Sequence, residues 1–270
     1  MSGQLYLLPC PISEAPALDA LPASTVETAR RIDHFLVEAA RTARATLKAM
    51  GHPKPIAELD IVEIGHDPAP ELISEWLQPV LDGADAAVLS ESGCPGVADP
   101  GAQIAARAHE LGICVVPLTG PSSILLTLMA SGLDGQRFRF SGYLPKHDAE
   151  RRAAILAAEK ASRASETQLF IETPYRNTAL LDALLETLAP DTRLTVAIDV
   201  TGQNESIRTL TAAAWKAIPK AMRTLPKLPT VFAFLAKPGK TAPRYAPECA
   251  GGKRAHTAPS SKPAVLNNRP

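Results

Sequence analysis

The chain has 270 residues, of which 46% are hydrophobic, and its 28 Lys and Arg residues balance 28 Asp and Glu residues. That length suits two domains of about 100–150 residues each. No apolar run approaches the ~20 residues of a membrane span, and the N-terminus lacks the basic segment of a signal peptide, so neither a membrane nor a secreted protein is expected. The four cysteines are far apart and form no CxxC motif, which argues against a zinc site or a disulfide framework and favours a reducing, cytoplasmic location.

Charge is distributed unevenly along the chain. From Lys237 onward there are seven Lys or Arg residues and a single acidic residue, Glu248, which leaves 21 basic and 27 acidic residues in the rest. This last segment is rich in Pro, Ala, Ser and Gly and has no apolar periodicity, so we expect residues 237–270 to form a disordered basic tail. Such a tail is either a solvated extension or an arm that contacts RNA phosphates.

Apolar runs of strand length alternate with helical patterns through the first half of the chain. This alternation predicts a parallel sheet with helices on both faces. The expected strands are Leu5–Leu8, Phe35–Val37, Ile61–Ile64, Ala86–Leu89 and Ile113–Val116, and the expected helices are Ala40–Met50, Glu71–Leu81 and Pro100–Leu111.

The pattern changes after an apolar helix expected at Pro121–Ala130, near the segment Phe138–Gly142. Further expected helices are Asp148–Ser162, Arg176–Leu188 and Ala212–Ile218, and further expected strands are Gln168–Ile171, Leu194–Asp199, Ser206–Leu210 and Thr230–Leu235. The predicted fold class is therefore α/β, with an N-terminal α/β domain over residues 1–120 and a C-terminal α/β domain over residues 121–236. The cleft between two such domains is the expected ligand site.

Two neighbouring strands of the first domain end in loops rich in small residues. Ser90–Gly101 contains three glycines and two prolines, and Thr119–Ser123 opens the apolar helix that follows. Glycine lets a ligand approach the bare backbone, while proline fixes the shape of a loop. Because ligands of open α/β sheets bind at the carboxyl ends of the strands, these loops predict a site for a nucleotide-like ligand.

Five segments resemble, in order and spacing, motifs of the tetrapyrrole methylase superfamily, whose members are S-adenosylmethionine (SAM) dependent methyltransferases with two α/β domains. The segments are Leu5–Ile12, Ser90–Gly101, Pro117–Ser123, Gly142–Pro145 and Glu172–Arg176. The pattern is most similar to the ribosomal RNA small subunit methyltransferase I family, whose motifs run SDAGTPxxxDPG, PLPGPSA, GFLP and YESPHR. The GxGPGD loop of precorrin methylases is absent, and the resemblance covers about residues 3–236.

The resemblance implies SAM as the cofactor, no metal, and 2′-O-ribose methylation of small-subunit rRNA as the reaction. It also implies a homodimer in the cytoplasm, with rRNA or the small ribosomal subunit as the partner. By position in the motifs, the residues expected around the cofactor are Pro9, Ser90, Glu91, Gly93, Val97, Ala98, Asp99, Pro121, Ser122, Ser123, Phe170, Glu172, Thr201, Pro229, Thr230 and Val231.

A base near the acceptor oxygen would assist methylation of a hydroxyl. The candidates are Glu38, Glu91, Asp99 and Glu172. Structural alternatives exist, because Asp99 precedes a helix that it could cap and Glu38 could pair with Arg41 or Arg44 one turn further on. The identity of the base stays open among the four.

Two departures from the family pattern bear on the substrate. The segment Glu38–Arg41 lacks the Asp of the family's Glu-Asp-Thr-Arg run, and Ala197–Gly202 replaces an Arg-Glu-Leu-Thr-Lys stretch. They favour one alternative to an rRNA methyltransferase, a SAM- or RNA-binding relative without catalysis. A second alternative is a tetrapyrrole-type or other small-molecule methylase, which the absent GxGPGD loop disfavours.

Overall fold

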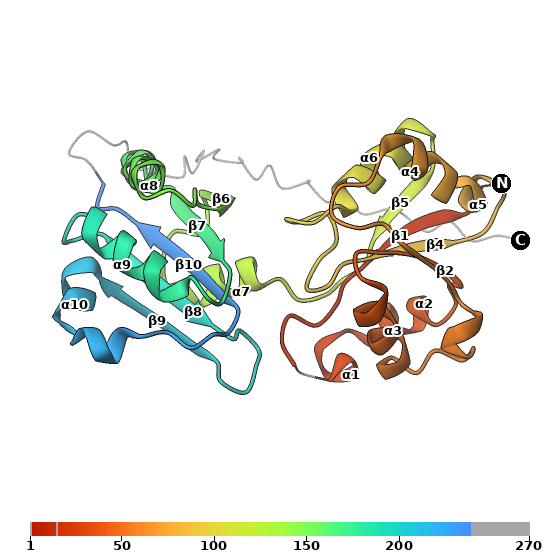
Figure 1. Ribbon diagram of the computed structural model, residues 1–270, viewed down its shortest axis with the longest axis horizontal. Coiled ribbons are helices and arrows are strands. Elements are labelled where there is room, and N and C mark those ends of the chain that lie inside the picture. The colour runs from red at the N-terminus through yellow and green to blue at the C-terminus, as the bar shows by residue number, and fades with distance from the viewer. Residues whose placement is uncertain (1, 15, 239–270) are drawn as a thin grey trace, which may run out of the picture.

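A computed structural model describes residues 2–14 and 16–238 of the chain. Two halves, each built on its own β-sheet, lie side by side (Figure 1). The chain passes from one to the other between β5 (Cys114–Pro117) and α7 (Ser123–Ser131). The predicted basic tail lies outside the described residues, apart from Lys237 and Pro238.

The first sheet has five parallel strands in the order β3-β2-β4-β1-β5. The strands not yet given are β1 (Gln4–Leu8), β2 (His34–Val37), β3 (Asp60–Glu63) and β4 (Ala86–Leu89). All residues of β2 and β4 are buried, as the uninterrupted apolar run of β4 predicts for a strand covered on both faces. Parallel pairing brings the carboxyl ends of all five strands to the same edge.

Helices cover both faces of this sheet. They are α1 (Ala17–Ala20), α2 (Ala23–Ala29), α3 (Ala40–Ala49), α4 (Pro70–Trp76), α5 (Gln78–Leu81) and α6 (Gly101–Glu110), with a 3₁₀ helix at Ile56–Glu58. Successive side chains of β2 point to opposite faces of the sheet, so this strand contributes to two separate hydrophobic cores. Phe35 packs with Leu47 of α3 on one face, while Leu36 packs with Ile73 of α4 and Ile104 of α6 on the other.

The second sheet is mixed, in the order β6-β7-β10-β8-β9, and only the β6–β7 pair is parallel. Its strands are β6 (Phe138–Tyr143), β7 (Thr167–Glu172), β8 (Arg193–Ile198), β9 (Ser206–Thr211) and β10 (Thr230–Leu235). Its helices are α8 (Asp148–Ser162), α9 (Asn177–Thr187) and α10 (Ala212–Ala217), with a 3₁₀ helix at Lys220–Arg223.

The faces of the second sheet are covered unequally. Phe170 of β7 packs with Leu181 of α9 on the face that α8, α9 and α10 cover. Leu169 and Leu128 belong to a separate cluster on the opposite face, where α7 packs. Helix α7 is therefore part of the second half of the molecule, although it directly follows the last strand of the first.

Two expectations from the sequence are corrected. The single helix expected over Glu71–Leu81 is two helices that meet at Leu77, because Pro79 has no backbone N–H and its ring disfavours a continuous helix. Helices α1 and α2 were not expected at all. Most other elements begin or end within one or two residues of the expected positions, and Asp148–Ser162 and Thr230–Leu235 coincide with them.

Candidate functional site

The two halves face each other across a cleft that contains a cavity of about 340 Å³, here called the main cavity. Its size falls within the roughly 300–1,000 Å³ that is typical of small-molecule sites. It is lined by Ile12, Glu38, Glu91, Ser92, Val97, Ala98, Asp99, Ser123, Ile124, Tyr143, Ile171, Glu172, Thr173, Pro174, Val200, Pro229, Thr230 and Val231. Loops at the carboxyl ends of β1, β2 and β4 supply one wall, which is the position where open α/β sheets bind ligands.

The loop after β4 is held in shape by the side chain of Asp99. Its Oδ1 atom accepts hydrogen bonds from the backbone N–H groups of Gly96, at 2.8 Å, and Gly101, at 2.7 Å. A Cβ atom at position 101 would lie 2.7 Å from that same Oδ1 and 2.9 Å from the nitrogen of Gly96, so only glycine fits there. Asp99 therefore closes the loop and accepts the N–H of Gly101, the first residue of α6.

The loops after β1 and β4 are also tied to each other. Cys10 and Gly93 form an antiparallel bridge, with N–H to oxygen distances of 2.8 and 3.2 Å. Gly93 has a φ of +74°, a conformation that favours glycine. The hydroxyl of Ser90 donates within the same loop, to the carbonyl oxygen of Gly93 at 3.3 Å. The wall of the cleft is thus preformed by backbone contacts.

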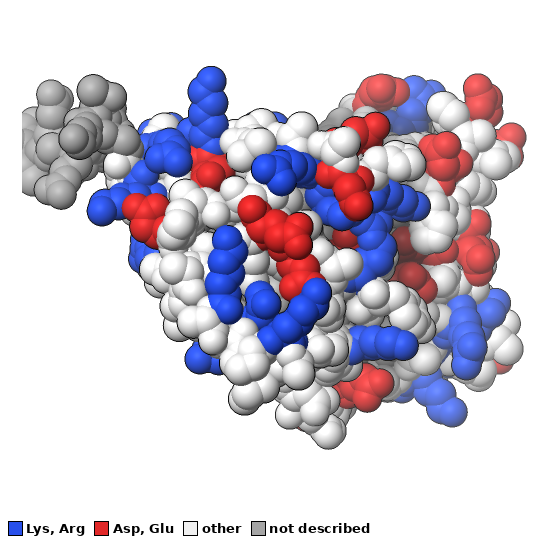
Figure 2. Space-filling view, turned by 60° about the vertical axis from the view of Figure 1, so that its left-hand side comes forward, with Lys and Arg blue, Asp and Glu red and all other residues white. Residues whose placement is uncertain are grey.

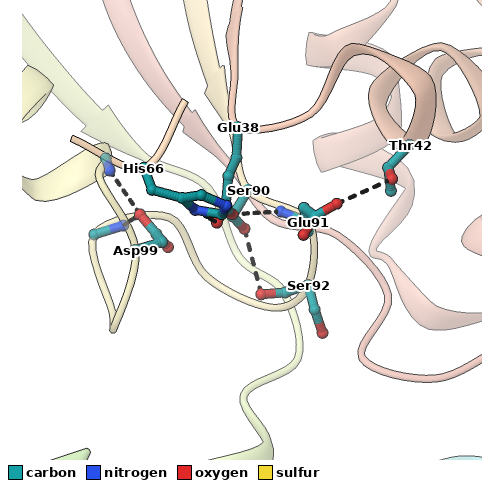
Figure 3. A network of polar contacts seen from close by, with 9 residues as sticks. Glu38, Thr42, His66, Ser90, Glu91, Ser92 and Asp99 are labelled. Atoms are coloured by element: carbon teal, nitrogen blue, oxygen red, sulfur yellow. Dashed lines mark hydrogen bonds and ion pairs between the residues drawn. The ribbon is translucent and has the colours of Figure 1, made fainter. Parts of the chain in front are cut away.

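The side chains of Glu38, Thr42, His66 and Glu91 form a polar network beside this wall (Figure 3). Glu38 Oε2 accepts the backbone N–H of Glu91 at 3.2 Å, and its Oε1 lies 3.1 Å from Nδ1 of the exposed His66. Glu91 Oε1 accepts the hydroxyl of Thr42 at 3.3 Å. Glu38 therefore pairs with His66, and neither Arg41 nor Arg44 takes the role that its helical spacing suggested.

The opposite wall comes from the second sheet. Glu172, at the end of β7, has a side chain that is only 1% exposed, and its Oε1 accepts the backbone N–H of Thr173 at 2.8 Å. Ile171, one residue earlier, lines the cavity. Phe170 points to the other face of the sheet and packs against Phe234, with ring centroids 5.6 Å apart.

Two buried carboxylate oxygens that belong to lining residues have no hydrogen-bond donor. They are Oδ2 of Asp99 and Oε2 of Glu172. The latter lies 3.2 Å from Nη2 of Arg176, an ion pair without hydrogen-bond geometry. A buried acceptor left without a donor costs roughly 1–3 kcal/mol. With Glu38, Glu91, Asp99 and Glu172 in its lining, the main cavity is suited to a ligand that carries positive charge or hydrogen-bond donors.

A second cavity of about 440 Å³, here called the side cavity, adjoins the main one. Ile12, Glu91, Ser92 and Pro229 line both. The other lining residues are Pro11, Ser13, Glu14, Asp199, Gln203, Asn204, Lys227 and Leu228. Glu91 is thus the ionisable side chain common to the two cavities within the described part of the chain.

The structure brings many of the residues expected around the cofactor to the main cavity. From the first half these are Glu91, Val97, Ala98 and Asp99; from the second, Ser123, Glu172, Pro229, Thr230 and Val231. All four candidate bases, Glu38 included, also line this cavity.

The remaining expected residues lie outside the lining: Pro9, Ser90, Gly93, Pro121, Ser122, Phe170 and Thr201. Several have a clear structural role. Pro9 packs where a Cβ atom on Gly120 would lie, 2.3 Å from its own Cβ. Ser122 caps α7 by accepting the N–H of Leu125 at 3.4 Å. Thr201 Oγ1 lies 3.1 Å from Ser13 Oγ, a contact between the two halves.

Some lining residues were not predicted: Ile12, Ser92, Ile124, Tyr143, Ile171, Thr173 and Pro174. Five of these lie in the segments that carry the family resemblance, namely Ile12, Ser92, Tyr143, Thr173 and Pro174. Position within a motif was therefore a usable signal for them. The other apolar residues look like core residues in the sequence.

Within residues 2–14 and 16–238, no group of three or more His, Cys, Asp or Glu side chains is arranged to hold a metal ion. In the same part of the chain, the helices are too short or too polar to cross a membrane.

Residues 17–215 match the model of a family described as Tetrapyrrole (Corrin/Porphyrin) Methylases. The ribosomal RNA small subunit methyltransferase I of Bacillus subtilis (strain 168) is 30% identical over 203 residues, which are 75% of this chain and 65% of that protein. The Vibrio cholerae protein of the same name is 30% identical over 205 residues, 76% of this chain and 67% of that protein. The chain thus matches about two thirds of the length of these relatives.

Solved structures share the fold at lower identity. A diphthine synthase has a TM-score of 0.61 and 17% identity, with 87% of this chain and 90% of that chain covered. The uroporphyrin-III-C-methyltransferase from Thermus thermophilus has a TM-score of 0.52 and 18% identity, with 87% of this chain and 93% of that chain covered.

One parallel and one mixed sheet on either side of a carboxylate-lined cavity define a two-lobed α/β protein. The match over residues 17–215 shows more: the chain belongs to the tetrapyrrole (corrin/porphyrin) methylase family.

Proposed function

We propose that this protein is a SAM-dependent methyltransferase that methylates a ribose 2′-hydroxyl of small-subunit rRNA. The observation that carries the proposal is the main cavity, whose lining includes the carboxylates of Glu38, Glu91, Asp99 and Glu172. SAM offers an ammonium group, ribose hydroxyls and an adenine amino group, all of which are donors to such oxygens. The names of the relatives from Bacillus subtilis and Vibrio cholerae support the rRNA acceptor.

The residues that hold the cofactor come from both halves in this proposal, with the domains spanning residues 1–120 and 121–236. Asp99 and Glu172 accept hydrogen bonds from opposite sides, and Val97 and Val231 provide apolar contact. Helix α7 presents the backbone N–H groups of its first turn, starting at Ser123, to the same cavity. The packing of α7 on the second sheet supports a boundary between the domains just before Pro121.

When bound, SAM supplies a methyl group that its sulfonium sulfur already activates. The protein's task is then mainly to position the acceptor, which is worth up to ~7–11 kcal/mol in favourable cases. Among the four candidate bases we favour Glu91, because its carboxylate lines both cavities. Its Oε1 is held by Thr42, and the carboxylate takes the proton of the acceptor hydroxyl.

The RNA is expected to approach along α3. Arg41, Arg44 and Lys48 are all exposed, and their spacing of three and four residues places them on one side of this helix. The hydrogen bond from Thr42 to Glu91 brings the start of α3 to the cleft. By contrast, the outer face of the second half carries Lys and Arg interspersed with Asp and Glu (Figure 2). Interspersed charges attract phosphates less than a continuous basic surface does.

We also propose that the protein acts as a homodimer in the cytoplasm. Helix α7 exposes Leu125 and Met129, which are 50% and 78% accessible and lie one turn apart. The edge strand β6 exposes Phe138 as well. Exposed apolar groups of this kind support an interface between subunits.

Calorimetric titration with SAM tests the cofactor site. Val97→Trp adds bulk at an exposed position in the main cavity, so we expect SAM affinity to fall at least tenfold while the thermal unfolding midpoint stays unchanged. Leu72→Trp is the matched control, because Leu72 has similar exposure, 43% against 46%, and lies on α4 away from the cavity. A folded Val97→Trp variant that binds SAM as tightly as the wild type would overturn the assignment.

A further inference from the structure

The side cavity lies beside the proposed SAM site but has a different character. Its lining combines the amide side chains of Gln203 and Asn204 with the carboxylate of Glu14, all of them exposed. Amides both donate and accept hydrogen bonds, and carboxylates accept them. Such a lining matches the edges of a nucleobase and the hydroxyls of a ribose.

The residues between β8 and β9 give this cavity a fixed wall. Asp199 has a φ of +48°, and its Oδ2 accepts the backbone N–H of Asn204 at 2.9 Å. A Cβ atom on Gly202 would lie 2.1 Å from Oδ1 of Asp199, so the turn requires glycine at this position. The wall is therefore built by tight local packing and does not depend on a ligand to form.

Lys227 contributes the one cationic side chain among the described residues that line this cavity. Its Nζ atom lies 5.1 Å from the ring centroid of Tyr175. Tyr175 is 81% exposed and belongs to the loop after β7, next to Thr173 and Pro174 of the main cavity. An exposed aromatic ring beside a cation is the combination with which proteins bind single-stranded nucleic acid, by base stacking and phosphate contact.

We propose that the side cavity is the acceptor subsite, which receives one nucleoside of a single-stranded RNA segment. The base stacks on Tyr175, the adjoining phosphate pairs with Lys227, and the ribose lies toward Glu91 at the junction of the two cavities. The inference rests on the proposed function and adds to it the place of the substrate. The two cavities adjoin but differ in their lining residues. The methyl donor can therefore occupy the main cavity and the acceptor the side cavity, with the reacting groups meeting where the cavities join.

Binding of a fluorescein-labelled single-stranded RNA oligonucleotide to the full chain, measured by anisotropy over a range of salt concentrations, tests the subsite. We expect Tyr175→Ala to weaken binding by roughly 5- to 100-fold, as for the loss of one stacked base, and Tyr175→Phe to retain it. Lys227→Met should reduce the slope of log affinity against log salt by about 0.7, the value for one phosphate contact on a single strand. Lys216→Met, at an exposed position on α10, is the control and should leave the slope unchanged.

The same variants are titrated with SAM, so that failure of the subsite and failure of the proposed function can be distinguished. Unchanged SAM affinity together with weakened RNA binding supports the subsite. RNA binding that is equal in the wild type, Tyr175→Ala and Lys227→Met, or absent from the wild type, overturns it whatever the SAM result. Absence of SAM binding by the wild type defeats the proposed function and leaves the RNA measurement valid.

Discussion

Cys10 connects the first strand of the protein to the cleft loop. Its thiol is 1% exposed and donates to the carbonyl oxygen of Ser90 at 3.0 Å, while its backbone pairs with Gly93. Burial raises the pKa of the Cys10 thiol from 9.0 to about 12, because the anionic form would lose its hydration. Cys10 lies in one of the segments that resemble the family motifs, and it acts as a neutral packing group that supports the cleft loop.

The raised pKa of Cys10 makes the free energy of unfolding decrease as the pH becomes alkaline. Between the two pKa values, the unfolded chain loses the Cys10 proton while the native protein keeps it, so this group lowers the free energy of unfolding by ~1.4 kcal/mol per pH unit as pH rises. We expect the stability advantage of the wild type over Cys10→Ala to shrink by about 1.4 kcal/mol between about pH 8 and about pH 10. Urea unfolding of both proteins measures it, and a constant difference would contradict the shift.

Glu91 is the residue on which the proposed chemistry depends. Glu91→Gln keeps an oxygen for Thr42 but removes the proton acceptor, so we expect turnover at saturating SAM to fall about 10²–10⁴-fold. Glu71→Gln, on the exposed first turn of α4, serves as the control in the same assay. Turnover of Glu91→Gln at the wild-type rate would exclude this residue as the base.

At the scale of elements, α7 joins the proposed cofactor site to the proposed subunit interface. Its first residue, Ser123, lines the main cavity, its Leu128 packs on the second sheet, and its Met129 is exposed. A helix that is apolar on most sides is usually buried, so the open face of α7 calls for a partner. The proposed homodimer supplies one.

Charge placed on that face should separate the subunits. We expect Met129→Asp to raise the dissociation constant of the dimer at least tenfold, because a carboxylate would lose its hydration in an apolar interface. Met222→Asp is a matched control, since Met222 is 76% exposed against 78% for Met129 and lies in the 3₁₀ helix Lys220–Arg223. Sedimentation velocity would contradict the interface if both variants remain dimeric, or if the wild type is a monomer.

Strands and long helices were predictable from the sequence because their apolar patterns are strong. Ala86–Leu89 is an uninterrupted apolar run, and the helix Asp148–Ser162 coincides with the expected span. Helices α1 and α2 are short and rest on tertiary packing, as Val26 shows by its place in the first core. Short helices of this kind depend on packing more than on propensity.

The candidate site was predictable in part for similar reasons. Glycine and serine loops such as Ser90–Gly101 have a recognisable composition, and the motifs place them at strand ends. Apolar residues of the cleft have no such signature. Phe170 and Ile171 are neighbours in one strand, and the sequence does not tell which of them faces the cavity; in the structure it is Ile171, while Phe170 packs in the core on the other face. A motif residue can also stabilise local structure without lining the cavity. Ser122 is an example, because its hydroxyl caps α7.

For the whole molecule, the arrangement of two halves around one cleft is what gives the chain its proposed activity. The first half supplies the loop closed by Asp99, the second supplies Glu172, and each leaves a buried oxygen that the other half does not satisfy. The main cavity and the side cavity both take residues from each half. The proposed methyl donor and acceptor therefore meet only where the halves meet.

The most direct test is transfer of labelled methyl groups from SAM to small ribosomal subunits, taken from a strain in which the gene for this protein has been deleted. We expect label in the rRNA of these subunits, none in subunits from the wild-type strain, and none when Val97→Trp replaces the wild-type enzyme. Binding of SAM without any label in the rRNA of the deletion-strain subunits would contradict it.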